Sequence, residues 1–259
     1  MIDRNDILTY ARLGGADPFW IENDYLQHIA LISVYSEFSN ELVFKGGTAL
    51  QKVYGLNRLS RDLDFNLSDM GSASKMKNVV KRINDYYESS YVGPDRVKHG
   101  IGFTLSVKGP SYNDTGVQHK LPITMNIEEK LELKPLFKTI NPGKIYKDPD
   151  LITYSLLVID EIEAMAEKIR ALVTRKEVEP RDVYDIWFML NSGVKVDVDM
   201  VKRKVEFDHG RFSARLLKNK LEEVRNLWEK DLNPLVRPLP EYEEVHTYLL
   251  GKFKAFDAI

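Results

Sequence analysis

Apolar residues follow mainly strand-like patterns in the middle of the chain and helical patterns elsewhere. In the first part, apolar residues at helical spacing predict helices at residues 3–12, 17–38 and 71–89. Between and after these helices, apolar runs and polar–apolar alternation predict short strands at 42–44, 62–65, 99–108 and 121–132. From residue 160 onward the pattern predicts helices alone, at 160–175, 180–191, 197–206, 210–230 and 239–255.

This change of pattern predicts an α+β fold with two domains. An irregular stretch from Pro135 to Pro149 separates the two patterns, and Asn141-Pro142-Gly143-Lys144 within it is typical of a turn. We therefore predict a small mixed β-sheet core flanked by helices at residues 1–150, followed by a helical domain at residues 151–259.

A glycine pair lies between the first predicted strand and the helical segment that follows it. Gly46 and Gly47 lack a Cβ, so their backbone N–H groups can approach an anion closely. Thr48 then begins the helix, and the dipole at a helix N-terminus favours a bound phosphate. This turn is a candidate phosphate cradle.

A pair of acidic residues follows in the next predicted strand. Asp62 and Asp64 alternate with Leu63 and Phe65, so both carboxylates lie on one face of the strand. Adjacent carboxylates repel each other unless a cation or a proton lies between them, and a hard divalent ion such as Mg²⁺ takes such oxygen ligands. Together with the glycine turn, the pair indicates phosphoryl or nucleotidyl transfer. The same spacing also fits a tight turn and two solvated aspartates on an edge strand.

Composition narrows the class of protein. The 259 residues are 43% apolar and 29% charged, as in a soluble globular protein, and the formal net charge of −2 provides no overall attraction to nucleic acid. The chain has no cysteine, which excludes disulfides and thiolate chemistry. No apolar run has membrane-spanning length, and the N-terminus lacks the form of a signal peptide. We predict a cytoplasmic protein without a membrane partner.

The glycine turn and the acidic pair belong to one longer pattern. Residues 44–50 read Phe-Lys-Gly-Gly-Thr-Ala-Leu, and residues 58–65 read Arg-Leu-Ser-Arg-Asp-Leu-Asp-Phe. This joined pattern resembles the nucleotidyltransferase toxins of the AbiEii type, relatives of the MenT toxins in the polymerase-β-like nucleotidyltransferase superfamily. A bare Gly-Gly or Asp-x-Asp would be weak evidence, whereas the joined pattern is specific. The resemblance implies a nucleotidyltransferase core in residues 1–150.

A second signature lies in the predicted helical domain. The segment from Glu163 to Leu172 contains Lys168, and Arg181-Asp182-Val-Tyr-Asp185 follows it. These residues resemble the family's helical Lys-x-x-Ala and Arg-Asp-x-Tyr-Asp patterns. The resemblance implies that Lys168 contacts the triphosphate and that Asp182 holds a neighbouring base or basic side chain, so that residues 151–259 complete the nucleotide site. Without it, Lys168 would be a surface lysine, and Asp182 would cap a helix and form local ion pairs. Asp185 is expected to be structural.

The third metal ligand is the point at which the chain departs from the family pattern. Members of the superfamily commonly supply a third carboxylate from a neighbouring strand, and the matching position here is Asn126. Because an amide cannot act as an anionic base, we predict Glu128 as the substitute ligand. The alternative is a solvent-facing glutamate.

The resemblance implies transfer of a nucleoside monophosphate from a nucleoside triphosphate to an acceptor hydroxyl. Asp62, Asp64 and Glu128 would hold Mg²⁺, with Mn²⁺ as an alternative. The phosphates would be bound by Gly46, Gly47, Thr48 and Ser60, and their charge would be offset by Lys45, Lys168 and Arg58. Arg58 has a second interpretation, in which it pairs with an aspartate.

The family also implies a biological setting, namely a toxin restrained by a cognate antitoxin in phage defence, with RNA, above all tRNA, as the acceptor. A basic region that includes Lys202-Arg203-Lys204, Arg211 and Arg215 is either an acceptor surface or a solvated face. The competing hypotheses are a small-molecule nucleotidyltransferase, a kinase, and a degenerate RNA- or protein-binding module, the last supported by the missing acid at Asn126.

Overall fold

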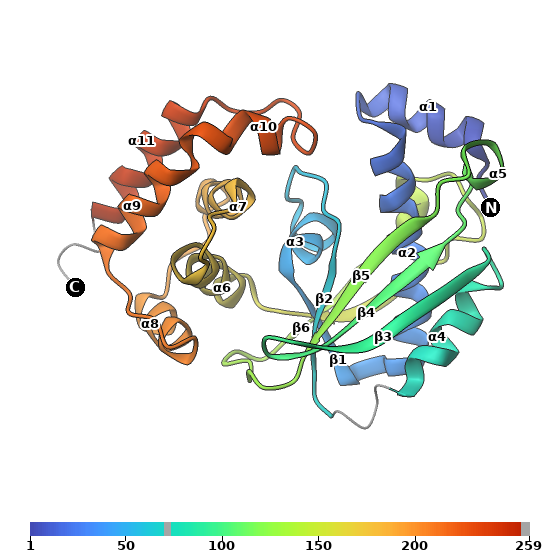
Figure 1. The fold of residues 1–259 in the computed structure, drawn as a ribbon, viewed down its shortest axis with the longest axis horizontal. Helices are drawn as coiled ribbons and strands as arrows, with labels where there is room; N and C mark the ends of the chain where they lie inside the picture. Colours follow the sequence, from blue (N-terminus) through green and yellow to red (C-terminus); the bar gives the residue numbers. More distant parts are fainter. Residues whose placement is uncertain (70–73, 255–259) are drawn as a thin grey trace. The chain divides into compact units, whose positions relative to one another are not determined.

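The computed structural model describes residues 1–69 and 74–254, which form two compact units (Figure 1). The first unit comprises Met1–Gly55 and Leu59–Ile159, and the second comprises Leu56–Arg58 and Asp160–Ile259. The first three residues of the helix predicted at 71–89, and the last residue of the helix predicted at 239–255, lie outside the described residues.

A seven-stranded mixed sheet is the framework of the first unit, in the order β3-β4-β5-β2-β1-β7-β6. The central strand β2 pairs parallel with β5 and antiparallel with β1, and β1 in turn pairs parallel with β7. The strands are β1 (Leu42–Lys45), β2 (Leu63–Leu67), β3 (Ser89–Val97), β4 (Gly100–Val107), β5 (His119–Asn126), β6 (Leu136–Ile140) and β7 (Tyr154–Val158).

Local signals in the sequence set the ends of the helices in this unit. Asp3 and Asp6 form a capping box at the start of α1, and Asp17 caps α2, which has a proline in its first turn. Gly55 ends α3 in the left-handed conformation that glycine adopts without strain. The helices are α1 (Arg4–Gly14), α2 (Pro18–Phe38), α3 (Gly46–Tyr54), α4 (Met76–Ile83) and α5 (Tyr112–Thr115), with 3-10 turns η1 (Ser39–Glu41) and η3 (Pro142–Lys144).

The two faces of the sheet differ in character at its centre. Phe44 and Phe65 are opposite one another in the ladder, with ring centroids 5.3 Å apart. The ring of Tyr35 in α2 packs edge-on against Phe65, with ring centroids 6.2 Å apart. Helix α2 therefore covers the apolar face, and α4 packs against α2 (Figure 1). The next pair in the ladder, Lys45 and Asp64, points to the opposite face because side chains alternate along a strand.

The second unit is helical. Helix α6 packs against α7, α8 and α9, and α7 contacts α9, α10 and α11 around a core that includes Met165, Ile169, Ile186 and Trp228. The helices are α6 (Glu161–Thr174), α7 (Pro180–Asn191), α8 (Val198–Phe207), α9 (Ala214–Val224), α10 (Trp228–Leu232) and α11 (Tyr242–Phe253), with the 3-10 turn η4 (Arg225–Leu227) between α9 and α10.

The predicted α+β fold, with a mixed sheet followed by a helical region, is confirmed. Three strands were not predicted: β3 and β6, which are the exposed edges of the sheet, and β7, which lies beyond the predicted boundary near residue 150. Strand β7 belongs to the first unit because it pairs with both β1 and β6. Among the described residues, every helix is too short or too polar to cross a membrane.

A cluster of buried polar side chains ties α2 to the rest of the first unit. Asp24 accepts from Lys52 at 2.9 Å and from the hydroxyl of Tyr146 at 2.8 Å. The ammonium of Lys52 also lies 3.3 Å from Nε2 of His28, whose Nδ1 lies 2.9 Å from the Tyr154 hydroxyl. Because an ammonium has no acceptor, Nε2 of His28 must accept from it and Nδ1 carries the ring proton. His28 is therefore neutral, and both of its ring nitrogens are used in hydrogen bonds within the cluster.

The charges in this cluster make the stability of the fold depend on pH. Burial, with a contribution from Lys52, lowers the pKa of His28 to about 3. Burial also disfavours the charged form of Asp24, but the adjacent Lys52 outweighs it and lowers the pKa of Asp24 to about 2. In both cases the unfolded chain binds its proton at a higher pH than the folded chain, so acid favours the unfolded state.

We therefore expect the free energy of unfolding to fall as the pH drops below about 6.5, the ordinary pKa of histidine. His28 alone contributes a slope of up to about 1.4 kcal/mol per pH unit down to pH ~3, and Asp24 adds a further loss below pH ~4. Urea unfolding of His28→Gln between pH 7.5 and 4.5 should give a flatter profile than the parent protein. Equal slopes in the parent and His28→Gln would contradict this account.

Candidate active site

The glycine turn lies directly against the acidic pair. Strand β1 ends at Lys45, and α3 begins at Gly46 with φ +76°, a conformation that favours glycine. A Cβ added at Gly46 would lie 2.4 Å from Oδ2 of Asp64. The ladder explains this closeness, because Lys45 is the cross-strand partner of Asp64 and the turn follows immediately. Only a residue without a side chain allows the backbone at position 46 to lie against this carboxylate.

The N-terminal turn of α3 is also fixed to the other aspartate. The buried hydroxyl of Thr48 donates to the main-chain oxygen of Asp62 at 2.5 Å. The backbone around Ser60 is held by Gln51, which accepts from its N–H at 3.0 Å, and by Gln27, which donates to its carbonyl at 2.9 Å. The predicted phosphate-binding residues Gly46, Gly47, Thr48 and Ser60 are thus brought together with Asp62 and Asp64, both of which are half-buried.

Polar side chains continue along this face of the sheet. Asn66 and Asn126 are paired across β2 and β5, and both are 7% exposed. Glu129 folds back onto them: it accepts from Nδ2 of Asn126 at 3.2 Å, and its carbonyl accepts from Nδ2 of Asn66 at 2.7 Å. Its carboxylate also lies 3.8 Å from the ammonium of Lys45. The structure therefore places Lys45 next to a buried glutamate that was not predicted as a site residue.

The structure does not bring the predicted third metal ligand to the acidic pair. Glu128 is 51% exposed at its side chain and lies 3.6 Å from His99 and 3.9 Å from Arg96. Within residues 1–69 and 74–254, there is no group of three or more acidic or histidine side chains arranged to hold a metal ion. Strand β5 ends at Asn126, so the alternation that would place Glu128 on the same face as Asn126 does not extend that far.

The donors on this face nevertheless suit a hard divalent cation. The side chains of Asp62 and Asp64 offer only oxygen atoms, the ligands that Mg²⁺ prefers. In addition, the buried Oδ1 of Asn66 has no hydrogen-bond partner among the described residues. A buried acceptor without a donor costs free energy, which a cation or a donor on a ligand would offset. The two carboxylates are the residues that would hold the metal.

A second cluster of charges lies in the second unit. The ammonium of Lys168 lies 3.1 Å from Asp182 and 2.7 Å from Asp185, and Arg175 pairs with the other oxygen of Asp182 at 2.7 Å. Arg58 donates to both oxygens of Asp185, at 2.6 and 2.8 Å. The cluster therefore brings Lys168 and Asp182 together, and Arg58 pairs with an aspartate.

Opposite charges determine the protonation states in this cluster. Burial lowers the pKa of Lys168, but Asp185 and Asp182 outweigh it and raise that pKa above its ordinary value. Burial likewise opposes ionisation of Asp185, yet Arg58 and Lys168 lower the pKa of its carboxyl. Lys168 is therefore cationic and Asp185 anionic at neutral pH. Asp185, which was expected to be structural, forms ion pairs with both Arg58 and Lys168.

The basic region of the second unit is only partly a surface. Lys204 is buried and pairs with the fully buried Glu163 at 2.8 Å, so it belongs to the core of this unit. Arg203, Arg211 and Arg215 are exposed. The solvated part of this region is consequently smaller than its sequence indicates.

Most of the chain matches a known protein family. Residues 30–259 match the family described as "Nucleotidyl transferase AbiEii toxin, Type IV TA system". No curated protein matches the chain by sequence.

Solved structures share the fold. MenT4, a nucleotidyltransferase toxin from Mycobacterium tuberculosis H37Rv, is 21% identical with a TM-score of 0.70, over 100% of this chain and 90% of that one. JHP933 from Helicobacter pylori is 15% identical with a TM-score of 0.55, over 92% and 93% of the two chains. A putative nucleotidyltransferase from H. pylori is 16% identical with a TM-score of 0.56, over 90% and 94%.

The close approach of Gly46 to Asp64 can be tested with a matched pair of glycines. Gly46→Ala places a methyl group against the carboxylate, whereas Gly55→Ala introduces alanine at a similar φ of +72° with nothing within 4 Å. Both substitutions strain the backbone, so only their difference measures the contact with Asp64. We expect Gly46→Ala to lower the free energy of unfolding by about 1–3 kcal/mol more than Gly55→Ala in urea titrations. Equal losses would show that the turn does not lie against Asp64.

Proposed function

We propose that this protein, which belongs to the AbiEii family of nucleotidyltransferase toxins, transfers a nucleoside monophosphate from a nucleoside triphosphate to a hydroxyl group of RNA. The observation that supports this most strongly is the contact between the glycine turn and the acidic pair, since a Cβ at Gly46 would lie 2.4 Å from Asp64. An anion bound at the turn is thereby placed beside two carboxylates, an arrangement that requires a cation.

The residues of the first unit bind and orient the triphosphate. Backbone N–H groups at Gly46 and Gly47 donate to phosphate oxygens at the N-terminus of α3, where the helix dipole favours negative charge. The Thr48 hydroxyl donates a hydrogen bond to the main-chain oxygen of Asp62 and thereby positions this aspartate. Ser60 lies in the loop that Gln27 and Gln51 hold in place.

Asp62 and Asp64 hold divalent metal, Mg²⁺ in the first instance and Mn²⁺ as an alternative. When bound, such a metal neutralises phosphate charge and lowers the pKa of a coordinated hydroxyl. Lys45, held beside the buried Glu129, adds positive charge on the same face of the sheet. Positioning and charge neutralisation account for most of catalysis in phosphoryl transfer, so these side chains need no covalent role.

Lys168 provides a further cation for the triphosphate, and Asp182 orients it. The ion pairs with Asp182 and Asp185 fix the ammonium of Lys168 in one position. A cation that is already held in place loses little entropy when an anion binds. It therefore stabilises the charge of the transition state more effectively than a mobile cation. Arg58 supports the cluster through its bidentate pair with Asp185.

Membership of the family supports the proposed acceptor and the proposed biological partner. The motifs at residues 44–65 and 163–185 resemble those of toxins for which tRNA is the expected acceptor. Arg203, Arg211 and Arg215 offer exposed positive charge for a phosphate backbone. In the cell the enzyme is a cytoplasmic toxin of a phage-defence system, restrained by a cognate antitoxin.

We expect Asp62→Asn and Asp64→Asn each to abolish transfer without unfolding the protein, because removing one carboxylate relieves the repulsion acting on the other. The assay incubates the protein with Mg²⁺, total RNA and each of the four nucleoside triphosphates labelled on the α-phosphate. Label should remain on RNA, within the tRNA fraction, and should disappear when the metal is chelated. Asp85→Asn, at an exposed aspartate outside the site, serves as the matched control.

Other outcomes of this assay identify a different reaction. Retention of a γ-label would indicate a kinase, and label on a small molecule would indicate a different acceptor. Activity that persists in Asp62→Asn would exclude the acidic pair as the catalytic centre.

The role of Lys168 is tested by comparing two lysines that both pair with buried acids. Lys168→Gln should lower kcat/KM for the triphosphate by about 100-fold or more, the usual effect of removing one preorganised donor from a charged transition state. Lys204→Gln removes the partner of Glu163 and should lower the free energy of unfolding while the folded fraction keeps its kcat/KM. Similar losses of kcat/KM in both variants would assign Lys168 a purely structural role.

A further inference from the structure

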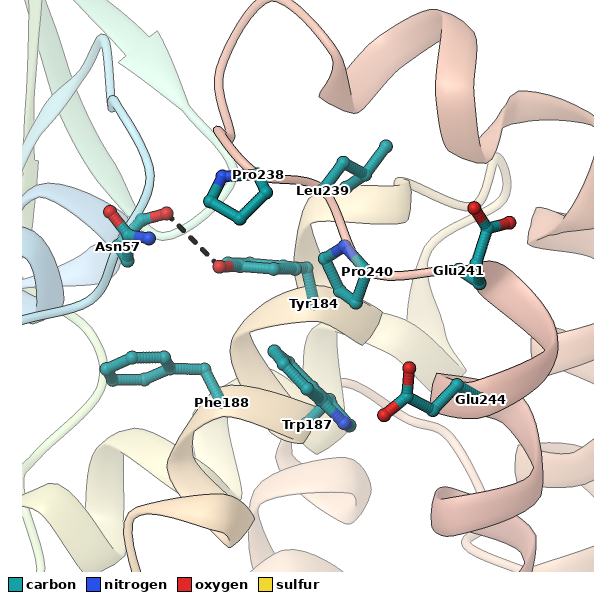
Figure 2. Close-up of a pocket in the computed structure, with 9 residues that line it drawn as sticks. All are labelled: Asn57, Tyr184, Trp187, Phe188, Pro238, Leu239, Pro240, Glu241 and Glu244. Atoms are coloured by element: carbon teal, nitrogen blue, oxygen red, sulfur yellow. Dashed lines mark hydrogen bonds between the residues drawn. The ribbon is translucent and has the colours of Figure 1, made fainter.

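A pocket of about 520 Å³ lies within the second unit (Figure 2). It is lined by Asn57, by side chains of α7, and by the segment from Pro238 to the first turn of α11. The hydroxyl of Tyr184 donates to the main-chain oxygen of Asn57 at 3.1 Å and closes one side. The pocket therefore has a fixed wall, built by residues that are distant in sequence.

Aromatic rings form much of the lining. Trp187 and Phe188 of α7 are half-buried, so their rings are partly accessible from the pocket, and Pro240 lies close to Tyr184 and Trp187 (Figure 2). Accessible indole and phenyl faces attract cations through the negative charge of the ring face, and tryptophan does so best. Flat apolar walls of this kind also accommodate the aliphatic part of a long side chain.

The polar part of the lining is acidic. Glu241 and Glu244 are exposed, and neither is in an ion pair within the described part of the chain. The adjacent Glu243 pairs with Arg225, and no lysine, arginine or histidine lines the pocket. Glu241 precedes α11 but makes no capping hydrogen bond. Two carboxylates without an ion-pair partner among the described residues thus lie at the edge of an aromatic pocket.

We propose that this pocket receives the cationic side chain, arginine or lysine, of a partner polypeptide. The cation lies over the ring of Trp187, where Glu241 and Glu244 neutralise its charge, and its aliphatic part packs against Pro240. Charge complementarity distinguishes this occupant from a nucleic acid, because phosphates would meet two carboxylates and no lining cation. The pocket is therefore a site for a protein partner.

Short peptides test this proposal on the full-length protein. The probe is an acetylated, amidated tripeptide Gly-Arg-Gly, titrated while the indole N–H resonance of Trp187 is followed by NMR; Trp187→Phe assigns that resonance among the three tryptophans. We expect a saturable shift at millimolar peptide with Arg and with Lys, and none with the neutral isostere citrulline. The double substitution Glu241→Gln/Glu244→Gln should weaken the binding of the arginine peptide by roughly fivefold or more.

A matched control separates the pocket from general charge. Glu177→Gln/Glu229→Gln removes the same charge from exposed positions in the second unit that do not line the pocket, and should leave the affinity for the peptide unchanged. Equal weakening in both double variants would overturn the proposal, as would binding of the citrulline peptide with the same affinity. A saturable Trp187 shift with a short RNA oligonucleotide but not with the arginine peptide would instead make the pocket a nucleic-acid site.

Discussion

The contact between the Gly46 backbone and the carboxylate of Asp64 is the constraint on which the candidate site depends. The antiparallel pairing of β1 and β2 sets Lys45 opposite Asp64, so the residue that follows Lys45 must turn directly beside this carboxylate. Two other features of the first unit support that geometry: α2 covers the apolar face of the sheet, and the Thr48 hydroxyl fixes the backbone of Asp62. The candidate phosphate cradle and the candidate metal ligands are consequently joined in one turn.

Several of the buried charges form groups in which each side chain has more than one partner. Asp24, Lys52 and His28 form one such group, and Arg58, Asp185, Lys168 and Asp182 form another. A buried charge is costly unless its hydrogen-bonding capacity is satisfied, and several partners satisfy it while restricting the side chain to one rotamer. Groups of this kind supply rigid side chains, which a site that binds highly charged substrates requires.

The sequence predicted the parts of the structure that local patterns determine. The glycine turn and the alternation from Asp62 to Phe65 depend on adjacent residues, and the structure brings these two features together. Edge strands β3 and β6 have little apolar alternation because much of their surface is exposed, so they carry little sequence signal. The prediction of Glu128 in place of Asn126 as the third metal ligand depended on where β5 ends. The pairing of β5 with β2 and β4 determines this end, and the sequence of β5 alone does not.

The three residues Leu56–Arg58 have a consequence for how this polypeptide can be divided. They belong to the second unit, although residues of the first unit both precede and follow them. Cleavage after Ile159 would therefore leave an N-terminal fragment in which the guanidinium of Arg58 has lost the carboxylate of Asp185. A single junction at this point therefore does not divide the polypeptide along its two units, because the bidentate pair of Arg58 with Asp185 crosses the cut.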